Sequence, residues 1–284
     1  MGSLTGAVEP GDPPGAGHRE RPRLGASEAI EADHDYGMAR GRVAEGARPL
    51  RGRHPLVLLS HGAFGSARNY SWITEHLARS GFAVAGIPHY RESPAYGPET
   101  IDPDRIGALG HSSGGATVIA LGGAVFDLQA MVRYCASEAA RADRGCAYAS
   151  GPSATTPAPP EASASHRDPR VRAIVALDPA LGPGHDPSPV RVPTHLVGAV
   201  DDFLPFEAHA GRYEGAPLRA ARRPPPPRPR RPPPRHFVFL GVCGWDRDAN
   251  GVPLCRDRPG VDRAEVHGRL REVIAGFFTE KLHA

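Results

Sequence analysis

The sequence lacks the features that mark membrane and exported proteins. It has no run of about 18 apolar residues that could cross a bilayer, and it does not begin with the basic and then apolar pattern of a signal peptide. We therefore expect a soluble protein without membrane contact. The sequence does not identify its compartment, and the cytoplasm is the default expectation. The 284 residues are 40% hydrophobic, which is enough for a sizeable buried core.

Cysteine is scarce, and its spacing excludes the common zinc and redox motifs. The four cysteines fall into two close pairs, Cys135 with Cys146 and Cys243 with Cys255, and neither pair has the CxxC spacing. Two local disulfides are one interpretation of this spacing. Four reduced thiols in a cytosolic protein are the other.

Basic residues are concentrated in one segment of the chain. Residues 222–235, RRPPPPRPRRPPPR, include six arginines, and without these six charges the net charge of +3 would be −3. A nucleic-acid-binding protein usually spreads Lys and Arg over a face with interleaved aromatic residues. The sequence outside this segment has no such face, so we expect no nucleic-acid partner.

The order of apolar patterns predicts the fold class. Residues 1–48 are rich in Gly, Pro and charge and predict a mostly irregular arm with room for a short edge strand, so the folded domain spans residues 49–284. Short apolar runs predict buried strands at residues 55–60, 82–87, 105–110, 171–178 and 193–202. Helical spacing predicts helices at residues 69–80, 111–126 and 262–282, the last with Val266, Leu270, Val273, Ile274 and Phe277 on one side. This alternation predicts a doubly wound, mostly parallel α/β sheet.

The chemistry of the chain is concentrated in Gly110-His111-Ser112-Ser113-Gly114, which has the GxSxG form. The motif lies between a predicted strand and a predicted helix, where the serine nucleophile of an α/β sheet sits on a tight turn. The glycines are needed because the turn has no room for side chains at the flanking positions. We interpret Ser112 as a nucleophile. The alternative is a serine–glycine helix start that serves only close packing.

A serine hydroxyl is a weak nucleophile at neutral pH, so it needs a base, usually a histidine oriented by a carboxylate. His236 is the best-placed late histidine, because His267 lies within the predicted last helix and His283 lies next to the last residue. Asp178 and Asp201 each lie at the end of a predicted strand, and either could orient the imidazole. The alternatives are a surface histidine and aspartates that cap turns or helices.

Backbone N–H groups are candidates for stabilising an oxyanion. The first predicted strand ends in Ser60-His61-Gly62-Ala63. The N–H of Ala63 and that of Ser113, which follows the predicted nucleophile, would be the two donors of an oxyanion hole.

The resemblance to a known family rests on three stretches, SHGAFGSARNYSWITEHLARSGFAVAG, DPDRIGALGHSSGGATVIALGG and DPRVRAIVALDPALGP. They are similar to the platelet-activating-factor acetylhydrolase and predicted dienelactone hydrolase group of the α/β-hydrolases, which includes relatives of bacterial polyester hydrolases. The resemblance covers most of residues 50–282. It implies an α/β-hydrolase sheet and carboxylic-ester hydrolysis through an acyl-enzyme without a cofactor. The acetylhydrolase branch implies Asp178 as the acid, which we place first, and the cutinase-like branch implies Asp201.

Two segments depart from the pattern that the resemblance implies. Residues 88–104 contain four prolines, so the helix after the second strand is expected to be missing or irregular. The prolines of residues 222–235 cannot donate ladder hydrogen bonds, so the strand that should precede the histidine loop cannot form there. We expect a polyproline II interruption with a rise of about 3 Å per residue. Residues 146–168 and 218–235 are expected to be low-complexity loops.

A separate motif has the spacing of a calcium loop. The oxygen-bearing residues would be Asp246, Asp248, Asn250 and Asp257. No helix clearly leads into this segment, and two of its positions are proline and cysteine. A polar loop closed by Cys243 and Cys255 is the preferred interpretation, so we expect no metal.

These patterns lead to two hypotheses of different classes. The first is a serine hydrolase that cleaves small carboxylic esters or lactones through an acyl-enzyme intermediate. No lid domain is apparent in the sequence, which favours small or exposed ester substrates. The second is a catalytically inactive or damaged hydrolase-fold protein whose Pro/Arg segment acts as a binding or spacer element. The sequence does not indicate the acyl or alcohol group or the oligomeric state.

Overall fold

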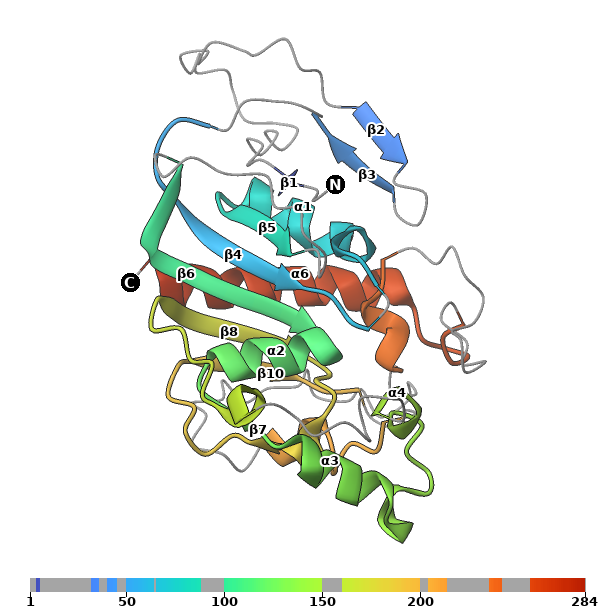
Figure 1. Cartoon of the computed structure of the whole chain (residues 1–284). Coiled ribbons are helices and arrows are strands. Elements are labelled where there is room, and N and C mark those ends of the chain that lie inside the picture. The colour runs from blue at the N-terminus through green and yellow to red at the C-terminus, as the bar shows by residue number, and fades with distance from the viewer. Residues whose placement is uncertain are drawn as a thin grey trace, which may run out of the picture.

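A mostly parallel sheet forms the centre of the protein (Figure 1). The computed structural model describes residues 4–5, 32–35, 40–44, 50–63, 65–87, 100–149, 160–199, 204–213, 235–241 and 256–283. Strand β1 is antiparallel to β5, and the other neighbouring strands are parallel. The sheet order is β1 (Leu4–Thr5), β5 (Ala83–Ile87), β4 (His54–Ser60), β6 (Ile101–His111), β8 (Val171–Leu177) and β10 (Thr194–Val197).

Helices cover both faces of this sheet (Figure 1). Helices α1 (Ser71–Arg79) and α6 (Arg263–Leu282) lie on one face, and α2 (Ser113–Leu121) lies on the other. Successive residues of a strand point to opposite faces, so β4 places Val57 in the core under α1 and α6 and Leu56 in the core under α2. The predicted doubly wound, mostly parallel α/β sheet is confirmed.

The strand order creates a switch point between β4 and β6. Strand β5 lies on one side of β4, whereas β6, β8 and β10 follow in chain order on the other side. The connections therefore leave this point in opposite directions, and α/β proteins bind ligands beyond the carboxyl ends of the strands at such a point. Ser60 and His111 end β4 and β6, so a ligand site is expected just beyond them.

Several element boundaries differ from the prediction. Strand β6 begins at Ile101 and not at residue 105, because residues 103–105 form a bulge between the pairs Pro55–Asp102 and Leu56–Ile106. The bulge removes Pro103 from the hydrogen-bond ladder, which is how a proline is tolerated inside this strand. Helix α2 ends at Leu121 and β10 at Val197, both earlier than predicted.

The prediction for one position of α6 was wrong. Leu270, Ile274 and Phe277 are buried as expected, but Val273 is 43% exposed. The apolar side of α6 also includes Phe278, which packs on Phe82, so the buried stripe runs closer to Phe278 and leaves Val273 at its solvent edge. The helix begins after the N-cap Asp262, whose carboxylate accepts two backbone N–H groups.

Smaller elements surround the sheet. Strands β2 (Ala32–Asp35) and β3 (Arg40–Val43) form a hairpin in the N-terminal arm that the sequence did not predict. A second short pair joins β7 (Val125–Phe126) to β9 (His185–Asp186). The remaining helices are α3 (Leu128–Cys135), α4 (Cys146–Ala149) and the 3₁₀ helices η1 (Ala67–Tyr70), η2 (Glu138–Ala140), η3 (Pro160–Ser163), η4 (Gly182–Gly184), η5 (Ala210–Tyr213) and η6 (His236–Phe239).

The first cysteine pair forms a disulfide that joins α3 to α4, between Cys135 and Cys146. Of the two interpretations left open by the spacing, the disulfide is the one found for this pair. Cys243 and Cys255 lie outside the described residues. Most of the two proline-rich segments at 88–104 and 218–235 is also outside them. No helix in the described part of the chain is long and apolar enough to span a membrane.

Several histidines are buried in the fold. Burial raises the free energy of the charged imidazolium and lowers the pKa of His185 and His267 to about 4. It lowers the pKa of His111 and His195 as well. These side chains are therefore neutral in the folded protein at neutral pH.

Acid should destabilise the protein through these histidines. Between about pH 4 and pH 6.5 the unfolded chain binds protons that the folded chain does not, so the free energy of unfolding should rise with pH by about 1.4 kcal/mol per pH unit for each such histidine. The measurement is urea unfolding across this pH range. His185→Gln should flatten the slope, and the exposed control His166→Gln should not. Equal slopes for the parent and His185→Gln would contradict this account.

Candidate active site

Ser112 lies on a strained turn between β6 and α2. Its backbone has φ 56° and ψ −122°, a conformation that residues with a side chain rarely adopt. Both flanking glycines are required for steric reasons. A Cβ on Gly110 would lie 2.1 Å from the carbonyl oxygen of Gly114, and a Cβ on Gly114 would lie 2.1 Å from that of Ser60. The structure thus agrees with the predicted need for glycine at both positions.

Backbone hydrogen bonds attach this turn to the end of β8. The N–H of Ser112 donates to the carbonyl of Leu177 at 3.0 Å, and the N–H of Ala180 donates to the carbonyl of Ser112 at 3.0 Å. Asp178 lies between Leu177 and Ala180 in the chain. The predicted nucleophile and one of the two predicted acids are therefore held in a fixed relation by the backbone.

Asp178 forms a buried pair with His236. The Asp178 Oδ2 and the His236 Nδ1 are 2.6 Å apart, and the two side chains are 4% and 1% exposed. The other carboxylate oxygen accepts the N–H of Ala199 at 2.9 Å. Because Nδ1 of His236 faces a carboxylate, it carries the proton, and in the neutral imidazole Nε2 carries the lone pair.

Two further buried side chains connect this pair to the loop after β4. The His111 Nε2 donates to the carbonyl of His236 at 3.1 Å, and its Nδ1 accepts the Tyr70 hydroxyl at 2.8 Å. The Tyr70 oxygen in turn accepts the N–H of Gly62 at 3.1 Å. Burial and the neighbouring His236 hold the pKa of His111 well below its usual value, so its ring is neutral and this set of donors is fixed.

The predicted oxyanion donors lie on the segments that flank Ser112. Ala63 is in an exposed turn closed by a 3.0 Å hydrogen bond from the N–H of Gly65 to the carbonyl of Gly62. A Cβ on Gly62 would lie 3.2 Å from the Cβ of Ser112, so this turn is packed against the predicted nucleophile. Ser113 is the first residue of α2, where backbone N–H groups have no acceptor within the helix.

The remaining predicted site residues are Asp201 and the four residues of the predicted calcium loop. Asp201 lies outside the described residues, and so do Asp246, Asp248 and Asn250 of the predicted calcium loop. The fourth residue of that loop, Asp257, is bound by the Arg263 guanidinium at 2.8 and 3.1 Å. Within the described ranges, no group of three or more His, Cys, Asp or Glu side chains is arranged to hold a metal.

Sequence reasoning missed Tyr70 and His111. His111 was visible as the second residue of GxSxG, but nothing in the motif indicated that its ring contacts the predicted base, with ring centroids 4.5 Å apart. Tyr70 was expected to lie at the start of a helix, and its contact with a residue 41 positions away has no local sequence signal.

Comparisons with known proteins give structural similarity only. No family model and no curated protein matches the chain. A ferulic acid esterase from Streptomyces cinnamoneus is 19% identical, with 84% of this chain and 70% of that chain covered and a TM-score of 0.47. A dienelactone hydrolase-like promiscuous phosphotriesterase, P91, from metagenomic libraries is 15% identical, with 90% and 99% covered and a TM-score of 0.43. Identities this low do not transfer an activity.

The strained turn predicts an asymmetry between two glycine substitutions. Gly114→Ala should lower the free energy of unfolding by about 2 kcal/mol or more, because its Cβ would collide with backbone and not with a flexible side chain. Gly276→Ala, in α6 with open space around the Cβ position, should raise it by about 0.5–1 kcal/mol. Urea unfolding measures both. A Gly114→Ala protein as stable as the parent would refute the described turn.

Proposed function

We propose that the protein is a serine hydrolase that cleaves small carboxylic esters or lactones through an acyl-enzyme intermediate. The observation that supports this most is the buried Asp178–His236 pair next to the strained turn of Ser112. A carboxylate, an imidazole and a serine on such a turn are the three parts of the catalytic triad used by hydrolases of this fold. The site also lies at the switch point of the sheet, where α/β proteins bind ligands.

In the proposed acylation step, the Ser112 Oγ attacks the ester carbonyl carbon while Nε2 of His236 takes the hydroxyl proton. The Asp178 carboxylate stabilises the imidazolium that forms, without taking the proton itself. The carbonyl oxygen becomes an oxyanion, which the N–H groups of Ala63 and Ser113 stabilise. His236 then donates the proton to the leaving alcohol oxygen, the C–O bond breaks, and the acyl group remains on Ser112.

Deacylation repeats these steps with water. His236 removes a proton from water, which attacks the acyl carbon, and the same two N–H groups stabilise the second oxyanion. The proton returns to the Ser112 Oγ as the acid leaves. The cycle consumes one water and needs no cofactor, which fits the chemistry of the residues in the site.

The alternative hypothesis, an inactive hydrolase fold with a Pro/Arg binding or spacer segment, depends on residues 222–234, which lie outside the described residues. No feature of the described residues favours it over hydrolysis.

Substitution of the predicted nucleophile tests the proposal. Ser112→Ala should lower kcat/KM for p-nitrophenyl butyrate by at least about 10³-fold, because the attacking oxygen is lost. Ser80→Ala is the matched control, since Ser80 is an exposed residue at the end of α1. Hydrolysis that is equally fast, or equally absent, in the parent and in Ser112→Ala would reject the proposal.

The two candidate acids make opposite predictions. Asp178→Asn should lower kcat by about 10³-fold or more, because the amide cannot hold His236 in the required tautomer or stabilise its imidazolium. Asp201→Asn should keep kcat within severalfold of the parent value. Steady-state kinetics of the two variants decide between them, and the reverse pattern would transfer the role to Asp201.

A further inference from the structure

The segment that carries His236 is held in an unusual way. Among the described residues no strand pairs with residues 235–241, and only the short 3₁₀ helix η6 gives the segment internal order. Its backbone bonds outside the helix include Val238 N–H to Arg235 O, Leu240 N–H to Phe237 O, and Gly241 N–H to Asn69 O. A single 3₁₀ turn has poor hydrogen-bond geometry and little rigidity of its own. The position of His236 must therefore be fixed by contacts from outside the segment.

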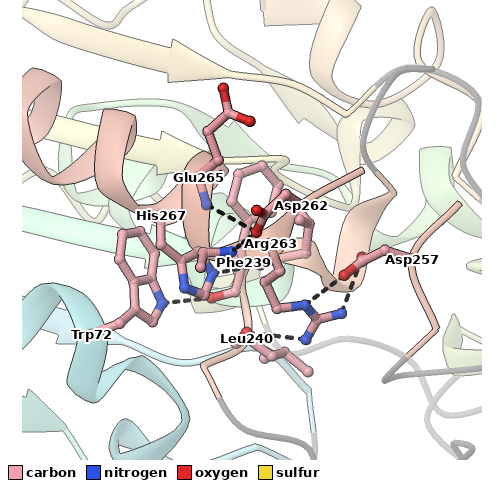
Figure 2. A network of polar contacts seen from close by, with 10 residues as sticks. Trp72, Phe239, Leu240, Asp257, Asp262, Arg263, Glu265 and His267 are labelled. Carbon is pink, nitrogen blue, oxygen red and sulfur yellow. Dashed lines mark hydrogen bonds and ion pairs between the residues drawn. The ribbon is translucent and has the colours of Figure 1, made fainter. Parts of the chain in front are cut away.

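Side chains from distant elements supply these contacts (Figure 2). The Trp72 Nε1 of α1 donates to the carbonyl of Phe239 at 2.9 Å. From α6, the His267 Nε2 donates to the carbonyl of Val238 at 2.7 Å, and the Arg263 Nη1 donates to that of Leu240 at 3.2 Å. We name Trp72, Arg263 and His267 the base clamp.

With these bonds, every carbonyl from His236 to Leu240 accepts a hydrogen bond. The carbonyl of His236 accepts from His111, and that of Phe237 accepts from the N–H of Leu240. Consecutive carbonyls in a buried, irregular segment are costly unless each one is paired. In a sheet, the backbone N–H groups of a neighbouring strand would donate to these carbonyls. Here the side chains of the clamp are the donors for three of them.

The clamp residues are held in place by contacts other than those with residues 235–241. The His267 ring stacks on the Trp72 indole with centroids 4.1 Å apart and planes 6° from parallel. The Arg263 guanidinium is bound in a two-point contact by Asp257 (Figure 2). The backbone carbonyl of Trp72 accepts the Arg271 Nε at 2.9 Å, which joins α1 to α6. Donors that are preorganised in this way hold their acceptors in one position.

We infer that the base clamp positions His236 against Asp178, in the place of the strand that the prolines of residues 222–235 are predicted to exclude. The inference rests on the proposed function, because the clamp affects catalysis only if His236 is the catalytic base. Trp72, Arg263 and His267 are positioning residues that act on the backbone two to four residues beyond the imidazole. A displacement of about 1 Å in a catalytic group can cost about 10²-fold in rate, so loss of one clamp donor should be visible in kcat.

The test uses the full chain and a pair of substitutions at one position. His267→Leu removes the donor and keeps an apolar side chain, whereas His267→Gln keeps an N–H donor close to the place of Nε2. Trp72→Phe removes the indole N–H and retains an aromatic ring. His195→Leu is the control, because His195 is a buried histidine of β10 whose Nδ1 has no hydrogen-bond partner in the described structure. All four are compared below the onset of thermal unfolding.

The first readout is amide hydrogen exchange, which does not depend on activity. In His267→Leu and Trp72→Phe the amides of residues 236–241 should exchange about fivefold faster or more, while those of residues 270–282 and all amides of His195→Leu should not change. Unchanged exchange at residues 236–241 would overturn the clamp, whether or not the protein hydrolyses esters.

The second readout is the separation of kcat from KM with p-nitrophenyl butyrate. His267→Leu and Trp72→Phe should lower kcat by about 10- to 100-fold with KM within about twofold, and His267→Gln should recover most of the loss. Faster exchange with an unchanged kcat would overturn the positioning role. Absence of hydrolysis in the parent protein would instead reject the proposed function, and hydrogen exchange would then decide on the clamp by itself.

Discussion

The contact between the Asp178 carboxylate and the His236 imidazole is the interaction on which the rest of the site depends. A carboxylate that is almost fully removed from water is costly unless it is paired and hydrogen-bonded. Asp178 meets this requirement with one backbone N–H from Ala199 and with the Nδ1–H of His236. Asp178, directly after β8, is therefore stable in its buried position only if His236, which lies 58 positions later in the chain, packs against it. The constraint fixes which nitrogen of the imidazole carries the proton.

Backbone strain is concentrated at the same edge of the sheet. The described residues other than glycine with positive φ are Ser112, Asp178 and Leu181. Such conformations cost about 1–3 kcal/mol each and persist where the surrounding structure holds them in place. Here the hydrogen bonds of Ser112 with Leu177 and Ala180 attach one strained position to the residues that precede the other two. Strain at residues that also carry a serine and a carboxylate supports the interpretation of this edge as a reaction site.

The sequence predicted the parts of the structure that have local causes. The apolar runs and the GxSxG turn have short-range physical signals, so the sheet, α2 and the need for Gly110 and Gly114 could be predicted. The bulge in β6 could not, because it depends on how Pro103 fits against β4. Local sequence also left Asp178 and Asp201 as equivalent candidates, since each lies at the end of a predicted strand.

The surroundings of His236 were beyond prediction for a different reason. Trp72 and His267 contact residues that lie 167 and 29 positions away along the chain, and such pairs leave no pattern in a single sequence. The sequence predicted that the prolines of residues 222–235 exclude a strand there. It did not indicate that side chains of α1 and α6 bind the segment that follows, so an inactive or damaged hydrolase fold stayed as the second hypothesis.

The most direct measurement of the central claim is covalent labelling by a fluorophosphonate. This probe reacts with a serine only when a base has activated its hydroxyl, and it does not require the natural substrate. We expect one adduct per chain, located at Ser112 by peptide mass spectrometry and absent in His236→Ala. A folded protein that remains unlabelled, or that is labelled at another serine, would contradict the assignment of Ser112, His236 and Asp178 to one catalytic unit.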